Sequence, residues 1–481
     1  MSTVLVVFAT TAAALAPNLG GMLSTLLGGA GTPMATPIKD AAPSLDDLAE
    51  SLRDSSTEDE IAFRSRLADG TLPHASALAK VRLFDGTRKD AERVTLYRDT
   101  AAWCPYCEKV WLMLEEKRVP YTVEKVNMNC YGEKPAWFWA MQPSGGIPVA
   151  KIDGQVIRES NDIIMAIENT FDGKPMLPVD EEEAAAVQPL LGLERQIFSC
   201  WFRWLTSGSN DGALRIQFVA LMAEVDDALA TRGGPYFLGA DTSLVDCMFA
   251  PFLERMAASV LYYKGLAVRT NGDWPNVVRW FEAMEERPSY RHICSDFYTH
   301  AHDLPPQIGR CQLTKEAERY AAAIDGLAAS WQIPLPQAGH EAIYEPIDHL
   351  GQDDDSARRE AAERLLANWK AVSRFSARGV GKRGFPPVSA PLSDPNAGVG
   401  ENLLPQVDIA LRHVVQSLLQ GELAPAELSD GLAVEVVTPS LGYLRDRVSV
   451  PRDMGYPAAR QLRAHLNSVI KGVAQKQATS T

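Results

Sequence analysis

The first candidates for chemistry are two cysteines three residues apart, Cys104 and Cys107, in the stretch WCPYC. A pair with this spacing can form a dithiol redox centre, supply half of a zinc site, or simply fill part of a hydrophobic core. These possibilities differ in what must surround the pair. A thiol centre needs a setting that stabilises a thiolate, whereas a zinc site needs further ligands.

The residues on either side place the pair between a strand and a helix. Residues 93–99 (RVTLYRD) alternate and favour a strand, and Pro105 suits the first position of a helix that ends near Arg118. Cys104 then stands at the helix N-terminus, where free backbone N–H groups and the helix dipole stabilise a thiolate. Cys107, one turn into the helix, is less exposed. We therefore expect Cys104 to be the nucleophile and Cys107 to be a resolving thiol.

A zinc site is not expected, and no metal ligand is assigned. The sequence has no second CxxC and no HxxxH, and no lone cysteines cluster near a histidine. His300 and His302, in YTHAHD, are interpreted as part of a surface loop. The other cysteines are interpreted as small buried apolar residues; they are Cys130, Cys200, Cys247, Cys294 and Cys311.

The elements after this helix complete a small mixed sheet. Residues 121–128 (YTVEKVNM) predict a second strand, so the first unit is strand, helix, strand with a right-handed crossover. Asp153-Gly154 between two short alternating runs predicts a hairpin. Residues 161–171 (NDIIMAIENTF) predict a helix with Ser160 or Asn161 as its cap. The order βαβ then ββα predicts four strands.

Strand signals end at the connector Asp172–Asp180, and long helical patterns follow. Ser243 with Asp246 three residues later is close to a capping box and marks the start of one of these helices. The last part of the chain alternates helical segments with Pro-rich connectors. It contains a group of four cations that is interpreted as a solvated loop rather than an anion site: Arg374, Arg378, Lys382 and Arg383.

Composition sets further limits. A chain of 481 residues suggests two or three domains, and a net charge of −14 argues against a binder of nucleic-acid phosphates. With 46% hydrophobic and 22% charged residues, the composition is that of a soluble globular protein. Seven scattered cysteines do not form a disulfide framework, so a reducing compartment fits best.

The segment from Arg93 to about Tyr298 resembles the glutathione transferase superfamily, with the closest likeness to its cysteine-type members, the omega class and the plant dehydroascorbate reductases. The likeness rests on several stretches in the same order: WCPYC, KPAWFWAMQPSGGIPV, GQVIRES, FLGADTSLVDCMFAPFLERM and WPNVVRWFEAMEERPSY. The resemblance implies a fold of the α/β plus all-α class. A thioredoxin-like βαβ-ββα domain would come first, then an all-helical transferase domain and a further helical extension.

The resemblance also implies roles for single residues toward the co-substrate glutathione. Cys104 would form the mixed disulfide, and the backbone of Ile147, before the cis-proline position Pro148, would pair with the tripeptide. Glu159 and Ser160 would bind the γ-glutamyl end, through its ammonium and its carboxylate respectively. A further residue, Lys134, would lie near the glycyl carboxylate. The second substrate is expected between the domains, against the helix that contains Phe198, Trp201, Phe202 and Trp204.

Glutathione-dependent thiol–disulfide exchange is therefore the predicted activity: deglutathionylation of protein or small mixed disulfides, or dehydroascorbate reduction. The omega pattern usually lacks the second cysteine, so one-cysteine and two-cysteine routes are both open. One alternative is conjugation of glutathione to electrophiles. Another is a non-catalytic glutathione-binding module that joins a larger assembly. The expected partners are glutathione and an oxidised or electrophilic substrate, with no nucleic acid and no membrane; a homodimer is possible by family likeness.

The chain is accordingly divided into a targeting presequence (1–39), an unassigned leader (40–92), the thioredoxin-like domain (93–172), the helical transferase domain (180–304) and the extension (305–481). The first of these begins with an apolar run and continues without acidic residues as far as Lys39. Its AALAP stretch resembles the cleavage region of bipartite plastid presequences, with Leu in place of the usual aromatic residue. The predicted location is the plastid; secretion and the cytoplasm are the alternatives.

Overall fold

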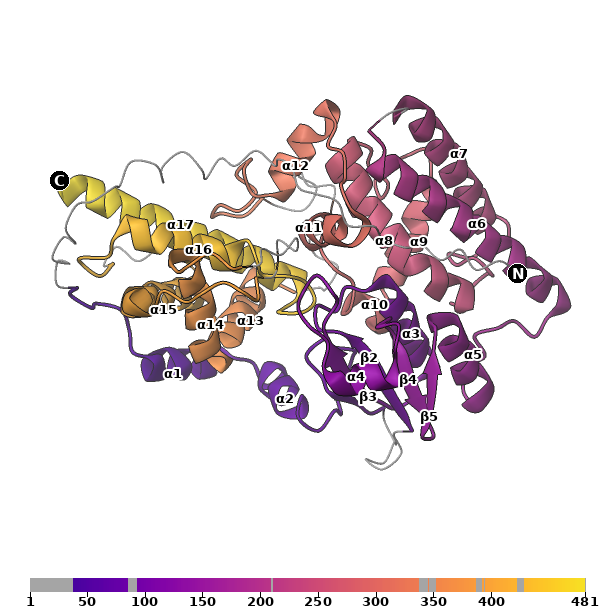
Figure 1. The fold of residues 1–481 in the computed structure, drawn as a ribbon, viewed down its shortest axis with the longest axis horizontal. Coiled ribbons are helices and arrows are strands. Elements are labelled where there is room, and N and C mark those ends of the chain that lie inside the picture. The colour runs from indigo at the N-terminus through magenta and orange to yellow at the C-terminus, as the bar shows by residue number, and fades with distance from the viewer. Residues whose placement is uncertain are drawn as a thin grey trace.

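The elements form three neighbouring groups: a sheet with its helices, a bundle of helices on one side of it, and a second set of helices on the other (Figure 1). The computed structural model describes residues 38–84, 93–208, 211–336, 345, 352–385, 392, 394–421 and 428–480. The predicted presequence lies outside the described residues except for its last two positions. In the part of the chain so described, no helix is both long and apolar enough to span a membrane.

The sheet has the order β1-β3-β2-β4-β5, with β2 and β3 parallel and every other neighbouring pair antiparallel. The hairpin between β4 and β5 turns at Asp153-Gly154, as predicted; both residues have positive φ, which an Asp-Gly pair tolerates. The strands are β1 (Val81–Arg82), β2 (Val94–Asp99), β3 (Tyr121–Val126), β4 (Val149–Ile152) and β5 (Gln155–Arg158).

The fifth strand, β1, is the difference from the predicted four. It comes from the leader and adds to the edge of the sheet beside β3. Two residues are too few for an alternating pattern, so the sequence carries no strand signal there. Arg82 Nε lies 3.0 Å from Glu115 Oε1, in the helix that follows Cys104, and both side chains are buried. This ion pair holds the edge strand in place.

Three helices belong to the sheet: α3 (Pro105–Lys117), α4 (Ala136–Met141) and α5 (Ser160–Thr170). Pro105 occupies the first turn of α3, as predicted, and Arg118 ends the helix in the left-handed conformation. The start of α5 differs from the prediction. Glu159 takes the N-cap position without a side-chain cap hydrogen bond, and Ser160 is the first helical residue.

A bundle around one buried helix follows. Ser243 and Asp246 form the predicted capping box at the start of α8, and Asp246 also accepts a hydrogen bond from Trp280 Nε1 at 2.9 Å. Every residue of α8 is buried, so it is the centre of this bundle. The helices are α6 (Glu181–Thr206), α7 (Asp211–Ala230), α8 (Leu244–Lys264), α9 (Pro275–Glu285), α10 (Pro288–Arg291), α11 (Phe297–Ile308) and α12 (Glu318–Ile324), with the short 3₁₀ helix η1 (Lys315–Ala317).

The extension forms a second hydrophobic core, and part of the leader belongs to it. Helix α1 (Leu45–Ser55) contacts α13 and α15, with Leu48 and Leu52 in this core, and α2 (Glu58–Arg66) follows it (Figure 1). The extension helices are α13 (Asp354–Ala367), α14 (Trp369–Ser376), α15 (Leu404–Gln420), α16 (Val434–Arg445) and α17 (Tyr456–Ser480), with 3₁₀ helices η2 (Ala377–Val380) and η3 (Glu401–Leu403).

Two predicted surface loops are wrong. His300 and His302 lie on α11, and the His300 ring is fully buried. The predicted basic loop is partly helical, because Arg374 belongs to α14 and Arg378 to η2. In both places the stabilising partners lie more than 20 residues away in sequence, so no local pattern reveals them.

Candidate active site

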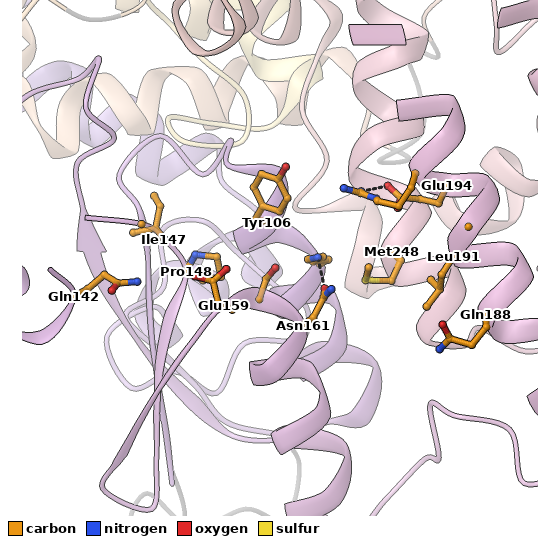
Figure 2. A pocket seen from close by; sticks show the side chains of 15 residues that line it. Tyr106, Gln142, Ile147, Pro148, Glu159, Asn161, Gln188, Leu191, Glu194 and Met248 are labelled. Atoms are coloured by element: carbon orange, nitrogen blue, oxygen red, sulfur yellow. Dashed lines mark hydrogen bonds and ion pairs between the residues drawn. The ribbon is translucent and has the colours of Figure 1, made fainter. Parts of the chain in front are cut away.

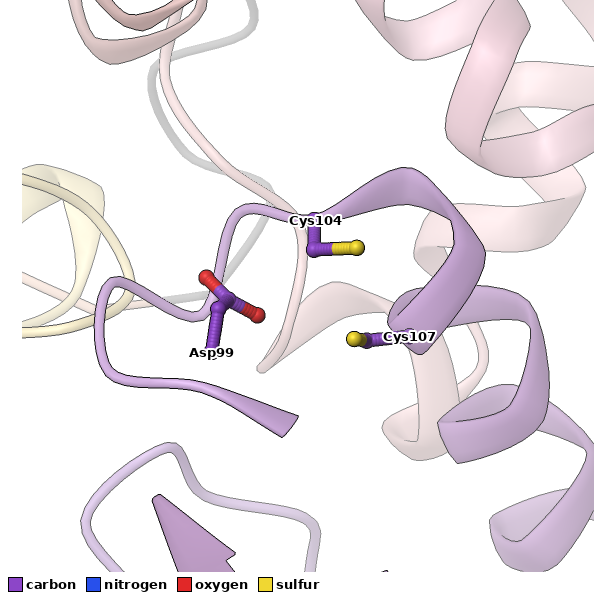
Figure 3. A group of neighbouring side chains, drawn as sticks. All are labelled: Asp99, Cys104 and Cys107. Carbon is purple, nitrogen blue, oxygen red and sulfur yellow. The ribbon is translucent and has the colours of Figure 1, made fainter. Parts of the chain in front are cut away.

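The two cysteine sulfurs and one carboxylate meet where β2 ends and α3 begins (Figure 3). Cys104 is the N-cap residue of α3 and is 6% exposed, whereas Cys107 is 1% exposed in the first turn. Sulfur atoms of both cysteines and a carboxylate oxygen of Asp99 lie within 4.8 Å of one another. Burial, and then the neighbouring Cys104, raise the pKa of the Cys107 thiol well above its ordinary value. Cys107 is therefore held as a thiol.

Asp99 is a member of this cluster that sequence reasoning did not single out. Its Oδ2 accepts a hydrogen bond from the Trp103 backbone N–H at 2.6 Å and so fixes the turn before Cys104. Together with the two sulfurs it offers three donor atoms to a metal ion. A structural zinc site takes four protein ligands, so this set is incomplete for that purpose.

The loop before Cys104 is also fixed from behind by buried polar groups of the helical bundle. Trp103 Nε1 donates to His300 Nδ1 at 3.0 Å, and His300 Nε2 donates to Glu254 Oε1 at 2.5 Å. Burial lowers the pKa of His300 to about 3, so the ring is neutral and can accept at one nitrogen while donating at the other. Arg255 donates to the Trp103 carbonyl and pairs with Glu108 at 2.9 Å.

Opposite Cys104 lies the loop before β4. The Ile147–Pro148 peptide bond is cis, and the carbonyl oxygen of Ile147 is 4.0 Å from Cys104 Sγ. Gly146, Ile147 and Pro148 line the neighbouring cleft, whereas Cys104 is not among the described residues that line it. The predicted pair of Ile147 and Pro148 is thus brought next to the cysteine from more than 40 residues away.

A cleft of about 590 Å³ separates these residues from helices α6 and α8 of the bundle (Figure 2). Figure 2 shows Tyr106, Pro148 and Glu159 on one side and Gln188, Leu191 and Met248 on the other. Glu159 and Ser160 both line it, at the start of α5. Since no side chain caps that helix, its first backbone N–H groups and the Ser160 hydroxyl can receive a carboxylate.

Two cations in this cleft were not predicted. Lys109 Nζ donates to Asn161 Oδ1 at 2.6 Å, and burial, followed by the nearby Arg195, lowers the pKa of Lys109 to about 8. Arg195 pairs with Glu194 next to it in α6. Lys109 is three residues after Tyr106, so a helical projection places these two cleft residues on one face of α3; Arg195 has no such signal.

The other predicted residues lie outside the set of described residues that line this cleft. Lys134 is mostly buried and donates from Nζ to Asn129 Oδ1 at 2.6 Å; burial lowers its pKa. Of the aromatic residues on α6, Trp201 and Trp204 belong to the core. Phe198 packs edge-on against Phe252 behind the cleft. The aromatic ring that does line the cleft is Tyr106, directly before Cys107.

Two family models match the chain: the glutathione S-transferase N-terminal domain at residues 103–170 and the glutathione S-transferase C-terminal domain at residues 186–283. Together with this fold and this site, they define a thioredoxin-like α/β domain followed by an all-helical transferase domain and additional C-terminal helices.

Two relatives of the chain also carry the name glutathione S-transferase. The chain is 30% identical over 171 residues to glutathione S-transferase DHAR2 of Arabidopsis thaliana, covering 35% of this chain and 75% of the relative. It is 31% identical over 194 residues to probable glutathione S-transferase DHAR1, cytosolic, of Oryza sativa subsp. japonica, covering 40% of this chain and 84% of the relative. The crystal structure of Chlamydomonas reinhardtii dehydroascorbate reductase matches with 22% identity and a TM-score of 0.35, covering 42% and 93%. The chain belongs to the glutathione S-transferase family, and glutathione is the co-substrate of that family.

Proposed function

We propose that this protein catalyses glutathione-dependent thiol–disulfide exchange with Cys104 as the nucleophile. The observation that carries the proposal is the position of Cys104 Sγ. It lies at the N-terminus of α3, 4.0 Å from the carbonyl oxygen of Ile147, and Ile147 lines the same cleft as Glu159 and Ser160. A helix N-terminus is a setting in which cysteine nucleophiles act, and the neighbouring cleft is large enough for a tripeptide and part of a second substrate.

Glutathione would lie along the loop before β4. The Ile147 backbone would pair with its cysteinyl unit as an added strand, beside Pro148. The Ser160 hydroxyl and the start of α5 would bind the γ-glutamyl carboxylate, and Glu159 the ammonium group. Lys134 remains the proposed partner of the glycyl carboxylate, for which its ammonium group would have to leave Asn129.

The reaction needs two exchanges. The Cys104 thiolate attacks the glutathionyl sulfur of a mixed disulfide; the Cys104–glutathione disulfide forms and the substrate leaves as a thiolate that takes up a proton. A second glutathione, as thiolate, then attacks the glutathione sulfur of that intermediate, which releases glutathione disulfide and restores the Cys104 thiolate. Since burial raises the pKa of Cys107, attack by Cys107 is disfavoured at neutral pH. We therefore favour the one-cysteine route.

The test is glutathione-dependent reduction of a small glutathione mixed disulfide by the wild-type protein, Cys104→Ser and Cys107→Ser. We expect Cys104→Ser to reduce turnover to that of the enzyme-free control, and Cys107→Ser to retain at least about half of it. Equal turnover in wild type and Cys104→Ser would refute the assignment. A larger loss in Cys107→Ser than in Cys104→Ser would refute the one-cysteine route.

Two parallel assays separate the alternatives. Formation of ascorbate from dehydroascorbate would extend the same chemistry to that acceptor, as the likeness to DHAR-type relatives suggests. Conjugation to an aromatic electrophile that survives Cys104→Ser would instead support a conjugating transferase. Glutathione binding without turnover in any assay would support a non-catalytic module.

The remaining expectations are also proposals. We propose the domain division given above, with the leader treated as part of both hydrophobic cores because Ala75 belongs to the first and Leu48 to the second. We propose delivery to the plastid; two of the relatives are named chloroplastic and another cytosolic. A homodimer is proposed by family likeness, and size-exclusion chromatography with light scattering tests it.

A further inference from the structure

A second large cavity lies in the extension, away from the glutathione cleft. Its volume is about 960 Å³, within the range of small-molecule sites. Its walls come from the end of α13, from α14 and η2, from the end of α16 and the loop around Arg452, from Leu462 on α17, and from the segment that includes Asp394 and Val399. Neither family model reaches this part of the chain, and the proposed exchange reaction does not use it.

The wall of this cavity carries many more cations than anions. Two carboxylates line it among the described residues, Asp394 and Asp453. The cations that line it are Arg364, Lys370, Arg374, Arg378, Arg447 and Arg452. In a chain whose net charge is −14, such a local excess of positive charge is unexpected for an inert surface.

Among the described residues, three of these cations form ion pairs with carboxylates and three do not: the exposed Lys370 and the half-buried Arg378 and Arg447. Arg374 pairs with Glu401 at 2.6 Å, and Arg452 pairs with Asp453 at 2.7 Å. By contrast, Arg378 donates to the backbone carbonyl of Asp394 at 2.8 Å, and Arg447 to that of Tyr443 at 3.3 Å.

The Nε atoms of these two arginines, Arg378 and Arg447, are buried without a hydrogen-bond partner. Within the described residues, neither guanidinium forms an ion pair with a carboxylate. A half-buried guanidinium without an anion is unfavourable, and an anionic ligand would relieve it.

Apart from Asn368, the rest of the described wall is apolar. Each of the two arginines also faces an aromatic ring: Arg378 lies over Phe375 at 5.3 Å, and Arg447 over Tyr443 at 3.6 Å. Such stacking fixes the guanidinium planes and leaves their remaining N–H groups in the plane for a carboxylate or phosphate. The apolar side chains that line the cavity include Leu365, Val372, Phe375, Leu444, Val448 and Met454.

We propose that this cavity binds an amphipathic organic anion: its carboxylate or phosphate meets Arg378 and Arg447, and its apolar body lies on α14 and the end of α16. The sequence predicted one solvated loop for four cations, and the structure separates them into two pairs: Arg374 with Arg378, and Lys382 with Arg383. Arg374 and Arg378 line the cavity, whereas Lys382 and Arg383 are exposed outside it. This division provides the control for the test.

The test is isothermal titration calorimetry of the full chain with dodecanoate below its micelle concentration, and separately with inorganic phosphate and with dodecanol. We expect dodecanoate to bind at one site and both other probes at least tenfold more weakly. The double variant Arg378→Gln/Arg447→Gln should bind dodecanoate at least tenfold more weakly. Lys382→Gln/Arg383→Gln removes the same number of charges nearby and should bind within twofold of wild type.

A second variant covers the case in which the arginine pair is needed for folding. Ala371→Asp places a negative charge on the cavity wall at an exposed position of α14, and should weaken dodecanoate binding at least tenfold with an unchanged melting temperature. Equal binding of dodecanoate by all variants would overturn the proposal, because the site would lie elsewhere. Phosphate binding as tight as dodecanoate would overturn its apolar half, and dodecanol binding as tight would overturn its charged half.

Discussion

The cleft beside Cys104 and the cavity in the extension differ in charge balance. In the cleft, Lys109 and Arg195 face Glu159 and Glu194, so both signs are present. This suits glutathione, which carries an ammonium group as well as carboxylates. In the extension, unneutralised arginines lie over an apolar floor, which suits a ligand with a charged head and an apolar body. One chain with a strongly negative net charge thus holds two sites of different electrostatic character.

The largest expected effect separates the two sites. Cys104→Ser should reduce mixed-disulfide turnover at least about 1,000-fold, because the replacement hydroxyl is not a nucleophile at neutral pH. The same variant should bind dodecanoate within twofold of wild type, because the extension cavity shares no lining residue with the cleft. Kinetics and calorimetry on one preparation check both. A loss of both properties together would mean that the two sites are coupled.

The second-largest effect is expected at the contact between the helical bundle and the extension. Arg463 on α17 pairs with Asp296, before α11, at 2.7 Å, and both side chains are buried. Arg463→Ala should lower the free energy of unfolding by about 3–4 kcal/mol, because it leaves a buried carboxylate unpaired. Denaturant unfolding measures this. The control is Arg374→Ala, which breaks the exposed pair with Glu401 and should change stability by about 0–1 kcal/mol. If the two variants change the free energy of unfolding equally, the Arg463–Asp296 ion pair does not stabilise the contact between the extension and the bundle.

A smaller loss is expected at the contact between the leader and the extension. Leu48→Ala should lower the free energy of unfolding by about 2–3 kcal/mol, because it opens a cavity at the edge of the second hydrophobic core. Ile61→Ala, at a position 46% exposed on α2, is the control and should have little effect. If Leu48→Ala is as mild as its control, α1 does not contribute to that core in solution.

The smallest effect concerns the charge balance of the cleft. Because the pKa of Lys109 is lowered to about 8, its charge is present at pH 7 and mostly lost at pH 9. The KM for glutathione should rise about threefold over this interval as one positive charge disappears beside the carboxylate site. Lys109→Gln should show the higher KM at pH 7 and no such rise.

The free energy of unfolding should also depend on the charge of Lys109. In contrast to glutathione binding, it should improve as this charge is lost. The unfolded chain still binds the Lys109 proton up to its ordinary pKa of 10.5, whereas the folded chain releases it near 8. Between these values the unfolded state holds more protons, so this group makes the folded state more stable as pH rises. Thermal melting of wild type and Lys109→Gln at pH 8 and 10 would show it as a difference between the two proteins.

Local patterns in the sequence were sufficient for the first half of the fold. The strand before Cys104, Pro105 at the helix start, the Asp-Gly hairpin and the Ser243 cap all depend on residues within a few positions of one another. The family likeness added Ile147, Pro148, Glu159 and Ser160, which the structure brings to one cleft, and the Ile147 carbonyl oxygen lies 4.0 Å from Cys104 Sγ.

What could not be predicted depends on contacts between distant segments. His300 was read as a loop residue because its partners, Trp103 and Glu254, are 197 and 46 residues away. The strand β1 is only two residues long, and its pairing with β3 becomes visible only in three dimensions. The arginines of the extension cavity come from α13, α14, η2 and the segment after α16, whose mutual approach leaves no repeating pattern in the sequence.

The packing of α1 against α13 and α15 has a consequence for how the chain acquires its structure. Arg412, on α15, donates to the carbonyl of Ala42, which lies 370 residues earlier in the sequence. This side of the second core therefore joins the beginning of the described chain to its C-terminal part. At about 5–20 residues per second, a ribosome needs roughly 20–75 s to make that intervening stretch. During this interval the apolar face of α1 has no native partner, so it is a natural place for a chaperone to bind the nascent protein.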